Sequence, residues 1–240
     1  MLELVLVATA TAVATGLGAI PVSMLGQRAI ALRPALLGLS AGVMTVAAVA
    51  GLLLPALDDG TNREVGIGLT LGIAFLLLAR RLLSFGRAEA MTAARRTSLL
   101  VFAVLFVHSL PEGLAIGTAF ASSTEGLALF IVVAIAIQNI PEGTSVAIPM
   151  EAAGYGGWQQ FWAAVATSLP QPVGAVIAYL LVEQVSALLP VSFAFAAGAM
   201  LALVVTEVLP DAVRSDRRRA GAGAAIGAVA MLILSSALGV

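Results

Sequence analysis

The chain has 240 residues, of which 60% are hydrophobic and 10% charged, with a formal net charge of −1 and a mean hydropathy of +1.07. Soluble globular domains are typically about half apolar and about one quarter charged, so this chain has too few charges to cover a water-soluble fold. The absence of cysteine excludes disulfides, thiolate metal sites and lipid-modified cysteines.

Eight apolar segments follow one another along the chain, and each is long enough to cross a bilayer as a helix. Their runs are continuous, which excludes the alternating pattern of a β-barrel, and the first is too long for a cleavable signal peptide. The sequence therefore predicts an all-α polytopic membrane protein with one transmembrane domain over residues 1–240. The predicted spans are 4–25, 35–57, 65–83, 98–121, 127–150, 161–182, 191–209 and 220–238.

The arginines are distributed very unevenly between the two sides of these spans. Only Arg63 falls on the side that holds both termini. Because cytoplasmic loops carry an excess of basic residues, we expect the odd-numbered loops in the cytoplasm and both termini outside, in a multi-pass protein of the cell (inner) membrane. The eleven arginines of the odd-numbered loops are Arg28, Arg33, Arg80, Arg81, Arg87, Arg95, Arg96, Arg214, Arg217, Arg218 and Arg219.

Pairs of glycines four residues apart recur in the second, third and eighth spans. Such pairs allow helices to approach closely, so they predict tight helix packing and leave a homodimer possible. The pairs are Gly38 and Gly42, Gly68 and Gly72, and Gly223 and Gly227.

The fourth and fifth spans carry ionisable residues near the middle of the bilayer, where such groups are costly and mark function by default. The fourth reads H-S-L-P-E-G from His108, and the fifth reads Q-N-I-P-E-G from Gln138. His108 and Glu112 lie one helical turn apart, as do Gln138 and Glu142. Because adjacent spans run antiparallel, we expect these four side chains to converge on one site.

A proline precedes each of these glutamates and a glycine follows it. Pro111 and Pro141 each remove a helix hydrogen bond, so we expect the two spans to be kinked at the core of the protein. Irregular backbone at this depth is tolerated where it lines a cavity.

Two buried glutamates need compensating charge, and no arginine lies in these middle segments to supply it. Either protons or a cation must do so, and one divalent ion cancels two carboxylates. With imidazole and carboxylate ligands, the natural choices are zinc, iron, manganese and cobalt.

These two segments resemble those of the ZIP (Zrt/Irt-like protein) family of divalent metal transporters, nearest its bacterial GufA-like branch. The family patterns H-S/N-x-x-E-G and H/Q-N/D-x-P-E-G match the chain from His108 and from Gln138. The resemblance implies a transporter, not an enzyme, that moves a divalent metal into the cytoplasm by alternating access. Zinc is favoured, with cadmium, iron, manganese and cobalt as other candidates. The metal is the transported substrate, and no prosthetic group or nucleic-acid partner is expected beside it and the membrane lipid.

The resemblance also assigns the site. It implies metal ligation by His108, Glu112, Gln138 and Glu142, with help from Met44 in the second span. Further carboxylates form a second metal position in binuclear relatives, but this chain has neutral residues there, so we expect one strong site. The positions concerned, with a seventh-span glutamate on the release pathway, are Ser109, Asn139, Gln171 and Glu207.

Two other functions stay open at this point. The glutamates suit a proton-coupled carrier of a small organic solute that binds no metal. They also suit an intramembrane metallohydrolase with a glutamate base, although one histidine is a thin supply of nitrogen ligands. An ATP-driven pump is excluded, since the sequence has no Gly-rich phosphate loop.

Overall fold

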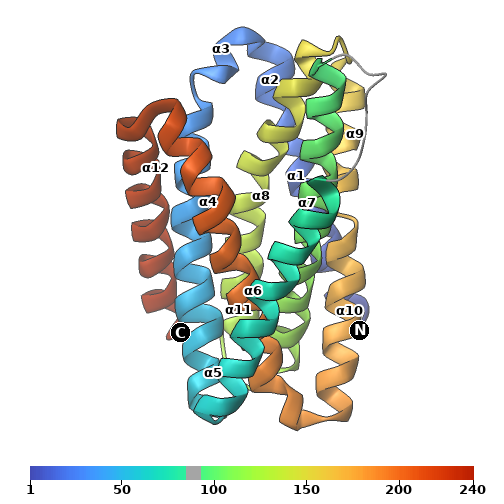
Figure 1. Ribbon diagram of the computed structural model, residues 1–240. Coiled ribbons are helices and arrows are strands. Elements are labelled where there is room, and N and C mark those ends of the chain that lie inside the picture. The colour runs from blue at the N-terminus through green and yellow to red at the C-terminus, as the bar shows by residue number, and fades with distance from the viewer. Residues whose placement is uncertain (85–92) are drawn as a thin grey trace.

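The computed structural model describes residues 1–84 and 93–240, and Arg87 of the predicted third loop lies outside these ranges. The described residues form helices joined by short connections (Figure 1). The helices, including π-helical η1 and η3 and 3-10 helix η2, are α1 Leu2–Leu17, α2 Ala19–Leu25, α3 Gln27–Ile30, α4 Arg33–Ala48, η1 Val49–Leu53, α5 Leu54–Asp59, α6 Asn62–Ser84, α7 Ala93–Ala121, α8 Leu127–Ala152, α9 Gly157–Thr167, α10 Pro170–Gln184, η2 Ser186–Leu188, α11 Leu189–Leu203, η3 Val204–Val208 and α12 Leu209–Leu238.

Seven segments of the described residues are long and apolar enough to cross a membrane, which confirms a polytopic all-α membrane protein. The first six correspond to the first six predicted spans. The seventh, Ser186–Leu238, has 53 residues and contains both the seventh and the eighth predicted spans. Its backbone leaves the helical conformation at Asp216 (φ −161°, ψ 103°). In Figure 1 the chain rises through α11 and comes back down beside α4 in the last part of α12.

Two predicted spans are divided in the structure. The first, 4–25, is interrupted at Gly18 between α1 and α2. The sixth, 161–182, consists of α9 and α10, and Pro170 opens α10 at a position where the missing N–H of proline costs no hydrogen bond. By contrast, α7 and α8 continue as helices through Pro111 and Pro141.

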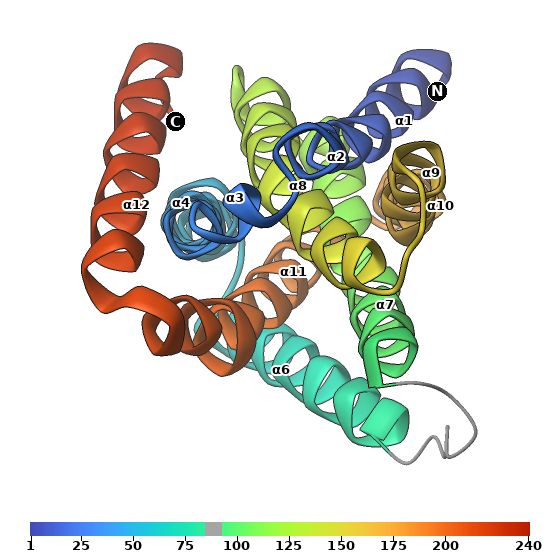
Figure 2. The ribbon, with the colours of Figure 1, turned by 90° about the horizontal axis from the view of Figure 1, so that it is seen from above.

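The long helices fall into two groups, seen end-on in Figure 2. The α4 group comprises residues 33–84 and 189–238, in which α4 packs along α12 and α6 packs along α11. The α8 group comprises residues 2–25 and 93–184, in which α7 packs along α10 and α1 packs along α8 and α9. Helices α4 and α11 contact α8 and α7, so the two groups meet along these four helices.

Within each group, glycines bring helix backbones into direct contact. A Cβ atom added at Gly42 would overlap the carbonyl oxygen of Ala224, and one added at Gly143 would overlap that of Thr15. Backbone contacts of the same kind occur at all six glycines of the predicted pairs. These pairs therefore serve helix packing inside the chain, and a homodimer stays a prediction.

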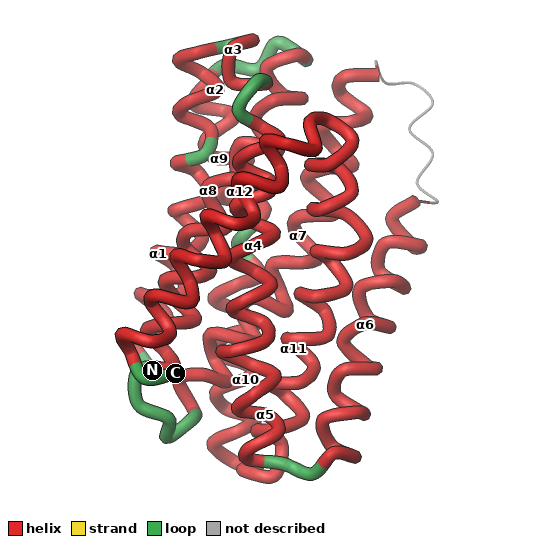
Figure 3. Tube along the Cα trace, turned by 90° about the vertical axis from the view of Figure 1, so that its left-hand side faces the viewer, coloured by secondary structure: helices red, strands yellow, loops and turns green. Residues whose placement is uncertain are grey.

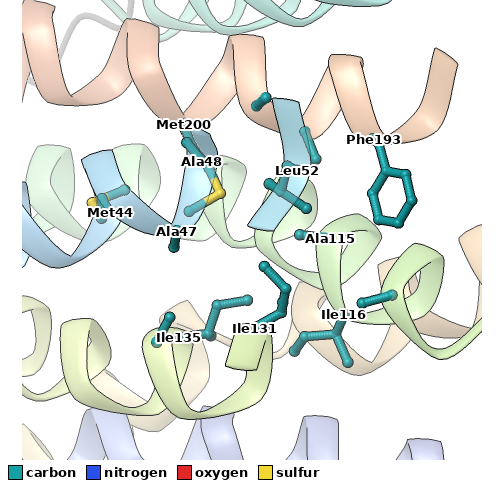
Figure 4. Close-up of a cluster of buried hydrophobic side chains, with 14 of the residues drawn as sticks. Met44, Ala47, Ala48, Leu52, Ala115, Ile116, Ile131, Ile135, Phe193 and Met200 are labelled. Carbon is teal, nitrogen blue, oxygen red and sulfur yellow. The ribbon is translucent and has the colours of Figure 1, made fainter. Parts of the chain in front are cut away.

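At the centre of the boundary between the groups, side chains make the closest contacts. The atoms nearest to a Cβ added at Gly51 would belong to the side chains of Ile131 and Phe130, at 2.6 to 2.8 Å. Figure 4 shows the apolar cluster that fills this boundary. It joins Met44, Ala47, Ala48, Leu52, Phe193 and Met200 of the α4 group to Ala115, Ile116, Ile131 and Ile135 of the α8 group.

The two chain termini lie toward one end of the bundle, and α3 lies at the other (Figure 3). The end that carries α3 also carries the start of α7 and the reversal between α11 and the last part of α12 (Figure 1). The arginine-bearing connections that the structure describes are therefore gathered at the end opposite the termini.

Candidate metal site

The four predicted ligands lie on two neighbouring helices deep inside the protein. Helix α7 carries His108 and Glu112, and α8 carries Gln138 and Glu142. Each is at most 4% exposed. His108 and Glu142 line the same cavity, and Gln138 contacts Glu112 directly. The helical spacing thus brings the two pairs together across the contact between α7 and α8.

Glu112 is held by two amide groups. Its Oε1 accepts a hydrogen bond from Nε2 of Gln138 at 2.5 Å, and its Oε2 accepts one from Nε2 of Gln171 at 2.7 Å. Gln171 comes from α10, and its own Oε1 accepts a hydrogen bond from the hydroxyl of Thr11 in α1 at 3.0 Å. Three helices of the α8 group therefore fix the orientation of this one carboxylate.

The other three predicted ligands have buried polar atoms without a hydrogen-bond partner. These atoms are both ring nitrogens of His108, Oε1 of Gln138 and Oε1 of Glu142. Buried polar groups are nearly always paired, because an unpaired one costs about 1–3 kcal/mol. A neutral imidazole offers one lone pair, and the amide and carboxylate oxygens offer more. A cation between these residues would bind one ring nitrogen of His108 and the two oxygens, and the other ring nitrogen would keep its N–H.

The described residues contain no group of three His, Cys, Asp or Glu side chains arranged to hold a metal ion. His108 is the only histidine of the sequence, and both oxygens of Glu112 already accept amide hydrogen bonds. A metal between α7 and α8 would therefore use a mixed ligand set that includes the amide oxygen of Gln138.

The residues of the predicted second position are fully partnered instead. The hydroxyl of Ser109 donates to the carbonyl of Leu105 at 3.0 Å, and the amide of Asn139 donates to the carbonyl of Thr11 at 2.6 Å. Gln171 also donates to Oδ1 of Asn139 at 3.3 Å. The polar atoms of these neutral side chains therefore have hydrogen-bond partners. None of them is left unpartnered like the ring nitrogens of His108 and Oε1 of Glu142.

The two outlying candidates have different surroundings. Met44 lies in the apolar cluster at the group boundary, where its sulfur accepts a hydrogen bond from the hydroxyl of Ser40 at 3.7 Å (Figure 4). Ser40 lines the cavity that contains His108, whereas Met44 does not. Glu207 lies in η3 and lines that cavity too, and its Oε1 is 2.6 Å from Nε of Arg80.

A cavity of about 230 Å³ leads away from the site between the two groups. His108 and Glu142 line it, and so do Glu207 and Asp211. A second cavity of about 430 Å³ shares these two acidic residues and reaches Arg214. Two neighbouring cavities with shared lining residues therefore lie between the buried site and the end of the bundle where the arginines gather.

Sequence reasoning missed several residues that shape the site. Thr11 holds Gln171, and the hydroxyls of Thr15 and Ser168 lie 2.7 Å apart between α1 and α9. Thr11 and Thr15 stand four residues apart in an apolar span. This spacing could have predicted that one face of the first span makes polar contacts with a neighbouring helix. Asp211 was also missed, although it follows Glu207 by one helical turn.

Comparison with known proteins identifies the family of this chain. The family model described as ZIP zinc transporter matches residues 85–235. The zinc transporter GufA of Myxococcus xanthus is 34% identical over 241 residues, which cover 94% of this chain and 95% of that protein. The zinc transporter ZIPB of Bordetella bronchiseptica is 34% identical over 94% of this chain and 78% of its own length.

A putative zinc transporter of Arabidopsis thaliana is also 34% identical over 95% of this chain, which spans only 38% of that longer protein. The matches to the two bacterial proteins cover most of both chains, and they agree with the resemblance seen in the two Pro-Glu-Gly segments. This chain belongs to the ZIP family of zinc transporters and is thus a multi-pass membrane transporter of divalent metal rather than an enzyme.

Proposed function

We propose that this protein carries a divalent metal ion, with zinc as the first candidate, across the cell membrane into the cytoplasm through one site formed by His108, Glu112, Gln138 and Glu142. The observation that carries the proposal is the set of unpartnered buried polar atoms on three of these four side chains, two of which, His108 and Glu142, line a cavity. A cation would bind the amide oxygen of Gln138 together with the imidazole of His108 and the carboxylate of Glu142, and for this reason we favour a metal ion over protons alone.

Each ligand has a distinct part in the proposed site. Glu142 and Glu112 supply two negative charges that one divalent ion cancels, while His108 supplies the nitrogen that zinc favours. The two amides orient Glu112, so that this carboxylate is placed before the ion arrives. Metal and protons compete for the same lone pairs, so protonation of the glutamates aids release.

The finer topology is part of the proposal. Eight crossings with both termini outside are supported by the backbone break at Asp216, by the two termini near one end of the bundle and by the arginines at the other. On this orientation, the cavities that lead from His108 toward Arg214 face the cytoplasm. The structure then corresponds to the state from which metal is released.

Alternating access follows from the two groups if the α8 group slides against the α4 group in an elevator-like manner. The α8 group carries the four ligands and is bound together by backbone contacts such as that of Gly143 with Thr15. The boundary between the groups consists of apolar side chains, which make no directional bonds and so can slide past one another. The ion would travel with the α8 group and leave past Glu207.

The test is metal uptake into proteoliposomes, with zinc, cadmium, iron, manganese and cobalt offered separately. Wild-type protein is compared with Glu142→Ala and with a matched control, Glu183→Gln, which changes an exposed carboxylate at the end of α10. We expect uptake by the wild type and the control and none by Glu142→Ala, and the order of the metals identifies the substrate. Undiminished metal uptake by Glu142→Ala would contradict the site, and transport of an organic solute in the presence of a chelator would support the proton-coupled carrier.

A further inference from the structure

The wall of the exit route differs in chemistry between the two groups. The α4 group contributes Glu207 and Asp211, which stand one helical turn apart and line both cavities. The α8 group contributes Leu100 and Val104 to the same two cavities. Where the two cavities share their lining, an ion that leaves the buried site therefore passes two carboxylates on one side and hydrocarbon on the other.

Each of these carboxylates is already paired with an arginine from a different helix. Nε of Arg80, in α6, lies 2.6 Å from Oε1 of Glu207, and Arg33, at the start of α4, forms an ion pair with Asp211. The four side chains are between 21% and 47% exposed. Both pairs are thus partly shielded from water, which makes them stronger than fully exposed pairs.

Without the arginines, the exit would present two unpaired carboxylates that stand four residues apart and line the same two cavities. Carboxylate oxygens bind hard and borderline cations well, and neighbouring carboxylates on one helix face reach the same ion. Such a position would retain the ion after it left His108 and Glu142. Guanidinium groups stay charged at any physiological pH and have no lone pair for a metal, so they neutralise carboxylates without acting as ligands.

We propose that Arg33 and Arg80 act as tethered cations at the exit, occupying Asp211 and Glu207 so that these carboxylates do not retain the ion released from the buried site. This inference rests on the proposed function, because it assumes that a divalent metal leaves by this route. The two arginines would then affect the rate of metal release. This role differs from setting the membrane orientation of the chain and from holding helices together.

The experiment removes the arginines and counts the bound metal. The variant Arg33→Gln/Arg80→Gln is purified in detergent, and zinc bound per chain is measured by equilibrium dialysis beside zinc uptake in proteoliposomes. We expect about one additional zinc ion per chain, held by the freed carboxylates. We also expect uptake to slow by about tenfold, since a tighter position releases its ion more slowly. The matched control, Arg28→Gln/Arg63→Gln, removes two exposed arginines that line neither cavity and is expected to match the wild type in both measurements.

Two further variants guard against a misfolded protein. Adding Glu207→Gln and Asp211→Asn to the arginine variant removes all four charges, and we expect the extra zinc to disappear. Glu207→Gln/Asp211→Asn alone leaves two unpaired guanidinium groups facing the ion, and we expect slower uptake without any extra zinc.

The outcomes separate this inference from the proposed function. If the wild type transports zinc while the arginine variant binds no additional zinc and transports at the same rate, the exit inference is overturned and the proposed function stands. If the arginine variant does not fold, unchanged uptake by Glu207→Gln/Asp211→Asn overturns the inference in its place. If wild-type protein neither binds nor transports any divalent metal, the proposed function fails first, and the inference fails with it.

Discussion

The two helix groups divide the polar and the structural tasks of the molecule between them. All buried ionisable side chains of the described residues, His108, Glu112 and Glu142, belong to the α8 group, together with the amides that orient them. The α4 group instead carries arginine–carboxylate pairs near one end and π-helical segments at the boundary. The difference teaches that the proposed ion-binding groups lie in a body held together by buried polar contacts, whereas the facing surfaces of the α4 group are mainly apolar.

The strongest test of the comparison is to join the two groups covalently. The chain has no cysteine, so Gly51→Cys/Ile131→Cys introduces the only two thiols, at a contact between η1 and α8. A short bifunctional thiol reagent should then reduce metal uptake to the level of empty vesicles, because the groups can no longer slide. The control pair, Ser23→Cys/Gly157→Cys, lies within the α8 group, where the Cβ positions are 2.8 Å apart, and its cross-linking should leave uptake intact. Full uptake by the cross-linked first pair would rule out movement between the groups.

The next test compares two glycines of the second span, Gly42 and Gly51, which lie nine residues apart. In Gly42→Ala the new Cβ meets the backbone of α12, which cannot move without separating the helices, and we expect about 2 kcal/mol of lost stability. In Gly51→Ala the new Cβ meets the ends of Ile131 and Phe130, which rotate away, so the cost should be below about 1 kcal/mol. Thermal unfolding in detergent measures both. Equal losses would show that the boundary is packed as rigidly as the interior of a group.

A third test concerns the positioning of Glu112 inside the α8 group. Gln171→Ala removes the amide that donates to Oε2 of Glu112, and we expect zinc affinity to fall about tenfold, as for other groups that orient a metal ligand. The control is Gln160→Ala, an equally buried glutamine whose amide donates to Glu151 and to the carbonyl of Tyr155. This control should lose stability while it keeps the affinity. Isothermal titration with zinc makes the comparison, and equal affinities in the two variants would remove the positioning role.

The smallest expected effect comes from one hydrogen bond at the break in the first span. Thr144 donates from its hydroxyl to the carbonyl of Gly18 at 3.0 Å, which joins α8 to the start of α2. Thr144→Val keeps the shape and should cost about 1 kcal/mol in thermal unfolding. Thr70→Val removes an exposed hydroxyl that bonds only within α6, and it should cost less than about 0.5 kcal/mol. Equal costs would mean that the α1–α2 break is not held by this contact.

Much of the fold was accessible from the sequence because a bilayer imposes a simple rule, that each crossing needs a long apolar helix. The same rule made His108, Glu112 and Glu142 visible, since charged groups have no other reason to stand in apolar runs. Helical spacing then placed each pair on one face. The continuity of Ser186–Leu238 was not predicted, because a single residue, Asp216, changes direction without an extended loop.

The partners of the site could not be read in the same way. Gln171 is 59 positions from Glu112 in the sequence, and nothing local indicates that α10 packs along α7. Arg80 and Glu207 are still more remote in the sequence, so their ion pair emerges only from the packing of α6 beside α11, which η3 follows. Patterns along the chain report which residues are unusual for their depth, but the choice of neighbours depends on tertiary contacts.

The two π-helical segments have a consequence for how this membrane protein tolerates changes in length. Deleting one residue from an α-helix rotates everything beyond it by about 100°, which would turn a buried face toward lipid. A π turn holds one residue more than an α turn, so a deletion inside Val49–Leu53 or Val204–Val208 can be absorbed by conversion to ordinary α-helix. The direction of Glu207 depends on that extra residue, because it stands inside the second segment. The extra residue of the π turn thus changes the rotation of the helix locally. Glu207 faces the cavity, while the apolar faces of the helix before and after the π turn keep their own directions.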